Sequence, residues 1–184
     1  MDTSAESIYE WLVTGKATAL GIGSQLVRKD LVAKKDFAAM EASVRKTLAM
    51  IAAVRAKIKA KEGKIFLGVR CIGVPADDAD GSAKVLAGLA GLGVSDCADT
   101  SCVSGSMGAC LHVGKGPFLV LVVSDLEKAV EIAKNSGAKV EGKPEIHAEK
   151  MVKSARLAEG AFGLGMPVIL ATMYSEELEK IVSK

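Results

Sequence analysis

The feature that most constrains the fold is an order of segments that occurs twice in the second half of the chain. Residues 65–94 (IFLGVRCIGVPADDADGSAKVLAGLAGLGV) and residues 117–140 (PFLVLVVSDLEKAVEIAKNSGAKV) each contain an apolar strand, an acidic turn, a helix and a glycine. Two such units, each followed by further strands, predict a duplicated α+β module. Because any two strand–helix units look alike, a chance likeness stays open as the alternative.

Composition narrows the class of protein. The chain has 184 residues, of which 49% are hydrophobic and only 4% aromatic, and this balance favours packed α/β layers over an all-β sandwich. A net charge of +2 argues against a nucleic-acid partner. No apolar run reaches membrane-spanning length, so no membrane partner is expected. The acidic N-terminus is unlike a secretory signal, and with four cysteines a reduced, cytoplasmic location is the default expectation.

The first sixty residues predict a different architecture from the rest. Helical spacing covers residues 5–14, residues 17–22 (ATALGI) are typical of a short buried strand, and residues 36–60 form a long helix with apolar residues at three- and four-residue steps. This helix–strand–helix–helix order is typical of the C-terminal end of a (β/α)8 barrel. We therefore expect two domains, residues 1–62 and residues 63–184. The fold class expected is α/β and α+β, with a partial barrel end joined to a βαβββ-type domain.

A glycine-rich loop after the expected strand carries the only predicted site. In a βα barrel the loop after a strand faces the end where active sites lie. Gly21, Gly23 and Ser24 would there offer main-chain N–H groups at a helix start, where the helix dipole also favours an anion. The sequence thus predicts phosphate binding by these three residues, with an ordinary structural loop as the alternative.

Residues 1–56 resemble the C-terminus of 2-keto-3-deoxy-6-phosphogluconate aldolases, a family that includes 4-hydroxy-2-oxoglutarate aldolases. The likeness is carried by Gly21-Ile22-Gly23-Ser24, by Leu26-Val27 and by Lys35-Asp36-Phe37. It implies a class I aldolase, a lyase of carbohydrate metabolism, acting on a phosphorylated keto acid. The family's Schiff-base Lys, general acid/base Glu and carboxylate-binding Arg lie on earlier strands that this chain lacks.

The missing strands leave the expected aldolase segment without catalytic residues. Lys16 and Lys29 do not replace the Schiff-base Lys, because such a lysine needs a desolvated site that one strand does not build. An isolated barrel end also exposes apolar faces. We therefore expect a homo-oligomer, packing onto residues 65–184, or a partner that supplies the missing barrel.

Residues 65–184 resemble the vicinal-oxygen-chelate (glyoxalase-like) fold, a tandem of βαβββ units. The resemblance rests on Val122–Ala129, on Ser136–Val140 and on the closing Pro167–Leu170. That family places metal ligands, His and Glu, on the first and last strands of each unit. Here the first-strand positions hold Cys71 and Phe118, and the final strand carries no carboxylate. The resemblance thus implies no metal of the family kind and no cofactor, but a small-molecule pocket or an oligomer interface.

The cysteines allow several interpretations. Cys97, Cys102, Cys110 and His112 lie close together in the sequence, and Cys and His are zinc ligands, but no Cys-x-x-Cys pair occurs. A Cys97–Cys102 redox pair and buried, inert thiols are the alternatives. His112 alternates with apolar residues, as in a half-buried strand, whereas His147 lies in a polar stretch of the sequence.

Two functions follow as hypotheses. The first is the C-terminal portion of a keto-acid phosphate aldolase fusion, inactive alone without its Schiff-base lysine. The alternative is a small-molecule binding, regulatory or oligomerisation module of glyoxalase-like fold.

Overall fold

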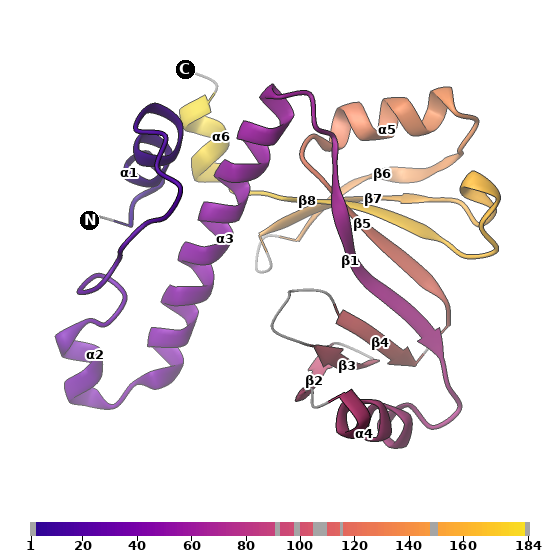
Figure 1. Ribbon diagram of the computed structural model, residues 1–184, viewed down its shortest axis with the longest axis horizontal. Helices are drawn as coiled ribbons and strands as arrows, with labels where there is room; N and C mark the ends of the chain where they lie inside the picture. The colour runs from indigo at the N-terminus through magenta and orange to yellow at the C-terminus, as the bar shows by residue number, and fades with distance from the viewer. Residues whose placement is uncertain are drawn as a thin grey trace. The chain divides into compact units, whose positions relative to one another are not determined.

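The computed structural model describes residues 3–90, 93–97, 100–104, 110–114, 116–147 and 151–182. Two compact units make up the chain (Figure 1). The helical unit contains residues 1–64, 146–153 and 172–184, and the α/β unit contains residues 65–145 and 154–171. The domain boundary predicted between residues 62 and 63 stays a prediction, because it concerns whether the two parts of the chain fold independently.

The α/β unit is built on one sheet in the order β2-β3-β4-β1-β5-β8-β7-β6. The strands of this sheet are β1 (Phe66–Pro75), β2 (Gly93–Cys97), β3 (Thr100–Ser104), β4 (Cys110–Gly114), β5 (Phe118–Val123), β6 (Val140–His147), β7 (Val152–Leu157) and β8 (Val168–Met173). The last two residues of β6, the first two of β7 and the last two of β8 are counted with the helical unit. Its helices are α4 (Ala79–Ala90), α5 (Leu126–Asn135) and the 3-10 turn η3 (Ala161–Gly163).

The two halves of this sheet share one topology. Each half runs strand–helix–strand–strand–strand, and in each half the first and last strands pair in parallel: β1 with β4, and β5 with β8. The halves meet where β1 and β5 pair antiparallel. A shared order of strands and the same parallel pairing favour duplication over chance likeness, and the expected tandem of βαβββ units is confirmed.

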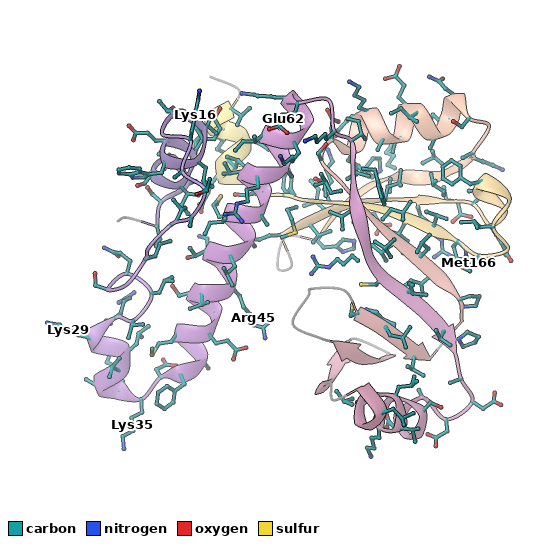
Figure 2. All side chains as sticks on the ribbon, in the orientation of Figure 1. Lys16, Lys29, Lys35, Arg45, Glu62 and Met166 are labelled. Carbon is teal, nitrogen blue, oxygen red and sulfur yellow. The ribbon has the colours of Figure 1, made fainter. Side chains whose placement is uncertain are left out.

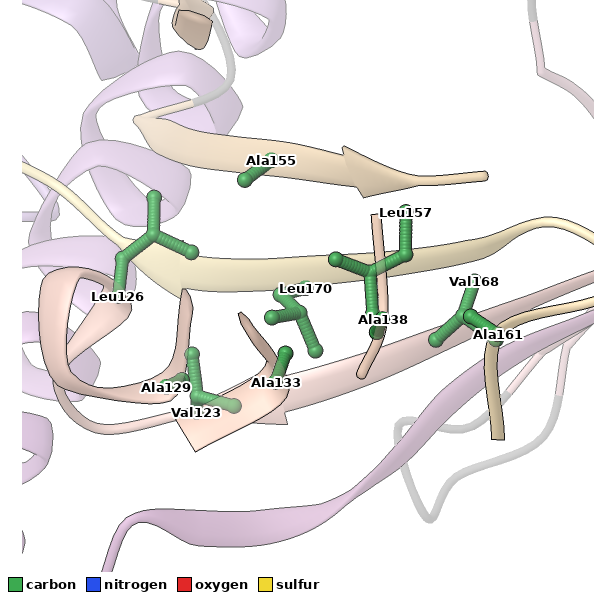
Figure 3. Close-up of a cluster of buried hydrophobic side chains, with 10 residues drawn as sticks. All are labelled: Val123, Leu126, Ala129, Ala133, Ala138, Ala155, Leu157, Ala161, Val168 and Leu170. Carbon is green, nitrogen blue, oxygen red and sulfur yellow. The ribbon is translucent and has the colours of Figure 1, made fainter. Parts of the chain in front are cut away.

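Both helices pack on the same face of the sheet. Helix α5 covers a core of buried side chains, which Figure 3 shows: Val123, Leu126, Ala129, Ala133, Ala138, Ala155, Leu157, Ala161, Val168 and Leu170. Helix α4 contributes Ala83 and Ala87, which pack against Val113 of β4. The register places Ile72 of β1 beside both Leu111 and Leu119, which face α4 and α5 respectively, so both helices lie on one side.

The helical unit joins the two ends of the chain. Its helices are α1 (Ala5–Tyr9), continued by the π-helical turn η1 (Glu10–Thr14), then α2 (Lys29–Lys34), α3 (Phe37–Lys61) and the C-terminal α6 (Glu176–Val182). A core shared by α1, η1, α3 and α6 is formed by Ala5, Ile8, Leu12, Met50, Ala53, Val54 and Leu178. Ion pairs Lys46–Glu177 (3.1 Å) and Lys57–Glu179 (2.7 Å) also link α3 to α6. The apolar face of α3 is thus covered in part by a segment from the far end of the sequence.

The predicted strand at residues 17–22 does not form. These residues are irregular, and only Ala17, Leu20 and Ile22 are even half-buried. A strand needs a neighbouring strand to satisfy its backbone N–H and C=O groups, and no strand of the described sheet pairs with residues 17–22. The expectation of a partial (β/α)8-barrel end is therefore not met: residues 3–62 pack as helices with α6.

Two sequence expectations missed strands in the α/β unit. Residues 93–107 are rich in Gly, Ser and Asp, which predicts turns, yet residues 93–97 and 100–104 form the antiparallel pair β2–β3. Residues 144–160 gave no clear pattern, yet they contain the end of β6 and all of β7. Both stretches are polar, and their pairing with neighbouring strands outweighs weak local propensity.

No helix among the described residues is long and apolar enough to cross a membrane.

Candidate thiol and metal site

Two cysteines meet at the centre of the sheet because β1 and β4 are neighbours. Cys71 and Cys110 are direct register partners in this parallel pair. Their Sγ atoms are in direct contact, 2.8 Å apart. Residues far apart in the sequence are thus brought together by the pairing of first and last strands in the first half.

His112 joins the two thiols from the same strand as Cys110. Alternation along a strand puts residues 110 and 112 on one face and residues 111 and 113 on the other. Val113 and Leu111 pack against α4, so the cysteine and the histidine point to the opposite face. The Nε2 atom of His112 lies 3.2 Å from Sγ of Cys110. One ligand atom from each of Cys71, Cys110 and His112 can be chosen so that all lie within 4.8 Å of one another.

We call the surface around this cluster the site face, defined by Cys71, Gly73, Cys110, His112 and Phe118. Cys71 is only 7% exposed, whereas Cys110 and His112 are half-buried. The cluster is therefore shielded on one side and accessible on the other, which is the environment of a binding site more than of a surface loop.

A glycine lets two aromatic rings approach across β1. Gly73 is paired with His112 on one side and with Phe118 of β5 on the other. A Cβ atom at residue 73 would overlap the Phe118 ring. Without it, the rings of His112 and Phe118 lie with centroids 5.5 Å apart and planes at 58°. Phe118 thus forms an apolar wall beside the imidazole.

Two thiols and an imidazole are the donor set of a thiophilic metal ion such as zinc. They differ from the His and Glu ligands of the vicinal-oxygen-chelate family. The second half supplies no counterpart: its first strand places Phe118 on the site face, and its last strand, β8, has the sequence VILATM with no carboxylate. The residues present therefore fit a soft metal held by one half of the sheet, and do not fit the family's donor set.

The predicted phosphate ligands lie elsewhere, in the helical unit. Gly21, Gly23 and Ser24 are exposed and lie in an irregular segment. The carbonyl of Gly23 accepts hydrogen bonds from the backbone N–H groups of Leu26 and Val27, closing a turn. No described helix begins at this turn, since α2 starts only at Lys29. Phosphate binding by these residues stays a prediction.

The two lysines excluded as Schiff-base residues are both exposed in the structure. Lys16 follows η1 and Lys29 begins α2, and Figure 2 shows the two side chains on different segments. Neither lies in the desolvated environment that a Schiff-base lysine needs.

Two of the weighed cysteines have a described backbone only. Cys97 lies on β2 opposite Thr100, and Cys102 lies on β3 opposite His112. Their side chains are outside what the structure describes, so the Cys97–Cys102 redox pair stays a prediction.

Sequence reasoning missed Cys71 as a partner of Cys110 and His112. The cysteines were grouped by closeness in sequence, whereas β1 and β4 are joined by a helix and two strands. A signal was present: in a βαβββ unit the first and last strands are neighbours. Cys71 was correctly placed on a first strand, so pairing that strand with residues 110–114 would have found the cluster.

Comparisons with known proteins give matches at the level of structure only. No family model and no curated protein matches the chain. A methylmalonyl-CoA epimerase from Mycobacterium tuberculosis is similar with a TM-score of 0.47 and 14% identity, over 65% of this chain and 93% of that one. A glyoxalase I variant from Zea mays gives a TM-score of 0.45 and 14% identity, over 60% of this chain and 45% of that one.

A methylmalonyl-CoA epimerase variant from Streptomyces coelicolor, in complex with 2-nitronate-propionyl-CoA, gives a TM-score of 0.43 and 13% identity. It is matched over 60% of this chain and 99% of that one. Similarities of this size concern fold and carry no argument about the site.

The aldolase identification is corrected by these findings. The similar structures are epimerases and a glyoxalase I rather than aldolases. The expected lyase, with its phosphorylated keto-acid substrate and its missing barrel, has no support. The glyoxalase-like module, given as the alternative, agrees with the tandem βαβββ sheet.

Proposed function

We propose that the chain is a metal-dependent small-molecule binding module, in which Cys71, Cys110 and His112 hold a thiophilic divalent ion such as zinc on the site face. The observation that carries the proposal is the convergence of three soft donor atoms, within 4.8 Å of one another, from two neighbouring strands. Rigid strands position such a site more accurately than loops do.

The number of ligands separates a binding site from a purely structural one. Structural zinc sites are closed by four protein ligands, whereas sites with three protein ligands keep a position for water or for a bound molecule. Three ligands are present among the described side chains. A bound zinc ion would act as a Lewis acid toward an oxygen of the molecule that takes the remaining position.

The surroundings of the cluster suit a small, partly apolar molecule. Phe118 stands next to His112, and Val120 and Ile169, which are register partners, continue the site face across β5 and β8. These apolar side chains are half-buried. Apolar walls with a few convergent polar groups are the usual composition of small-molecule pockets.

Metal titration of the reduced, metal-free full chain tests the proposal. We expect one equivalent of Co²⁺ to bind with the intense near-ultraviolet absorption of thiolate-to-cobalt charge transfer, and Zn²⁺ to displace it. Cys71→Ser, Cys110→Ser and His112→Ala each remove a ligand and should weaken zinc binding by more than about tenfold. A chain that takes up no metal, or three variants that bind as tightly as the parent, would refute the metal site.

Matched controls distinguish ligand loss from general damage. His147→Ala removes the other histidine, which is exposed and lies at the end of β6, and should leave binding unchanged. Cys97→Ser serves the same purpose among the thiols. Cys102→Ser is measured as well, because the register of β3 places this residue opposite His112.

A further inference from the structure

The spacing of the two thiols suits bond formation as well as metal binding. A tetrahedral ion with metal–sulfur bonds of about 2.3 Å holds its sulfur ligands about 3.8 Å apart. A disulfide brings them to about 2.05 Å. The observed Sγ–Sγ distance of 2.8 Å lies between the two, so a small side-chain rotation in either direction reaches one state or the other.

The backbone also permits the bond. Neighbouring strands are separated by about 4.8 Å, and disulfides form across Cα–Cα distances of about 4.4–6.8 Å. Cys71 and Cys110 are direct register partners, so their Cβ atoms leave the sheet on the same face. No movement of the strands is needed to join them.

We propose that Cys71 and Cys110 form a reversible disulfide by exchange with a low-molecular-weight disulfide, and that this oxidation releases the metal ion. The inference rests on the proposed function for its second half, because both sulfurs are metal ligands there. The thiol–disulfide exchange itself rests only on the geometry of the two cysteines.

The order of attack follows from accessibility. Cys110 is half-buried and Cys71 is 7% exposed, so the small disulfide reaches Cys110 first. The Cys110 thiolate attacks one sulfur of the small disulfide, forms a mixed disulfide and expels one thiolate. The Cys71 thiolate then attacks Sγ of Cys110, forms the internal bond and expels the second thiolate. The two cysteine thiols are oxidised, the small disulfide is reduced to two thiols, and the two protons pass from the cysteines to those products.

The consequence for the site is a change in donor set. A disulfide sulfur carries no negative charge and is a poor ligand, so oxidation leaves His112 as the only unchanged donor of the three. The site therefore holds metal when its thiols are reduced and empties when they are joined.

Mass spectrometry of the full chain tests the inference. The metal-free protein is incubated with oxidised glutathione, alkylated, and cleaved with trypsin and with cyanogen bromide. Trypsin cuts after Arg70, Lys84 and Lys115, and cyanogen bromide cuts after Met107, so Cys71, the Cys97–Cys102 pair and Cys110 fall in three separate peptides. We expect peptides 71–84 and 108–115 to be linked, at two hydrogens below their summed mass, and to separate on reduction.

Variants and zinc uptake complete the test. Cys71→Ser should stop the reaction at a glutathione adduct on Cys110, while Cys97→Ser with Cys102→Ser should leave the linkage intact. Zinc uptake by the oxidised parent should fall by more than about tenfold and recover on reduction.

The outcomes separate the two proposals. If the reduced chain binds zinc but residues 71 and 110 remain unlinked, or only Cys97 and Cys102 are joined, the disulfide inference fails and the metal site stands. If the linkage forms but the reduced chain binds no zinc, the exchange stands and the proposed function fails with its metal release.

Discussion

Because glycine has no side chain, Gly73 allows the rings of His112 and Phe118 to approach each other. Gly73 lies between them on β1, and the Phe118 ring occupies the space that a Cβ atom would take. The glycine does not have a positive φ, so its role is one of space and not of backbone freedom. Close approach of another group is one of the reasons for which glycine occurs in a strand interior.

Gly73→Ala should therefore destabilise the α/β unit. The added methyl group displaces the Phe118 ring, and overpacking of this kind costs about 1–3 kcal/mol. Urea unfolding followed by far-ultraviolet circular dichroism measures the change. The same substitution should weaken zinc binding if the contact between Phe118 and His112 orients the imidazole.

Gly88→Ala is the matched control for this glycine. Residue 88 lies in α4, where an added Cβ meets nothing within 4 Å, and a helical alanine is favoured over glycine by about 0.5–1 kcal/mol. The two substitutions should thus have opposite signs. Equal effects at both positions would show that the space at residue 73 is not filled by Phe118.

The roles of individual residues were predicted correctly where they depend only on neighbours in the sequence, as helix caps do. The pair Ser124-Asp125 before residues 126–136 predicts a helix cap, and in the structure the carboxylate of Asp125 accepts a hydrogen bond from the backbone N–H of Lys128 at 3.0 Å. Ser175 at the start of the C-terminal helical segment likewise predicts a cap, and its Oγ accepts a hydrogen bond from the backbone N–H of Leu178 at 3.3 Å. The cluster of Cys71 with Cys110 was missed because its cause is not local: it depends on which strands are neighbours.

Helix α6 holds the helical unit together although it is the last element of the chain. Leu178 is 1% exposed and packs in the same core as Ile8 of α1 and Val54 of α3. The helix has only seven residues, so its own propensity does not keep it folded. Its stability comes from the contacts that its buried face makes.

Leu178→Ala should destabilise the helical unit by about 2–5 kcal/mol, because it leaves a cavity in this core. Trp11, the only tryptophan of the chain, lies in η1 and reports on this unit alone by fluorescence during urea unfolding.

Leu48→Ala makes the same change on the exposed side of α3, where the leucine is 60% exposed. It should shift the free energy of unfolding by no more than about 0.5 kcal/mol. A similar loss in both variants would mean that α6 does not pack on α1 and α3.

Elements with strong periodic patterns were predicted closely. The helix expected at residues 36–60 is α3 (Phe37–Lys61), and the strand expected at Phe118–Val123 is β5 with the same bounds. The strand expected at residues 17–22 was a wrong prediction. A short apolar run indicates that its residues tend to be buried, but it does not say whether strands or helices bury them, and here they pack near helices. Strands β2 and β3 were missed because polar residues at a sheet edge carry little signal of their own.

The whole chain crosses between its two units four times, after residues 64, 145, 153 and 171. The α/β unit nonetheless contains its own two cores and all three proposed ligands. The sequence predicted the duplicated sheet of this unit. It did not predict that residues 172–184 belong with the N-terminal helices, because the pattern of apolar residues in α6 does not indicate which core the helix packs in.

A fragment of residues 65–173 should fold alone and bind one equivalent of zinc. It retains every strand of the sheet together with α4 and α5, and its cores need no residue from α1 or α3. Circular dichroism, amide hydrogen exchange and zinc titration of the fragment check this expectation. A fragment that is unfolded, or folded without zinc binding, would show that the helical unit is required for the site.

The place of α6 in the core of the helical unit sets the order in which this protein matures on the ribosome. A chain emerges from its N-terminus, and domains generally fold as they are made. Here α1 and α3 emerge first, but the helix that completes their core is synthesised only after every strand of the sheet. The nascent chain therefore carries an uncovered apolar helix surface throughout the synthesis of the α/β unit. During that interval the surface is open to chaperones, and the docking of α6 would end their access.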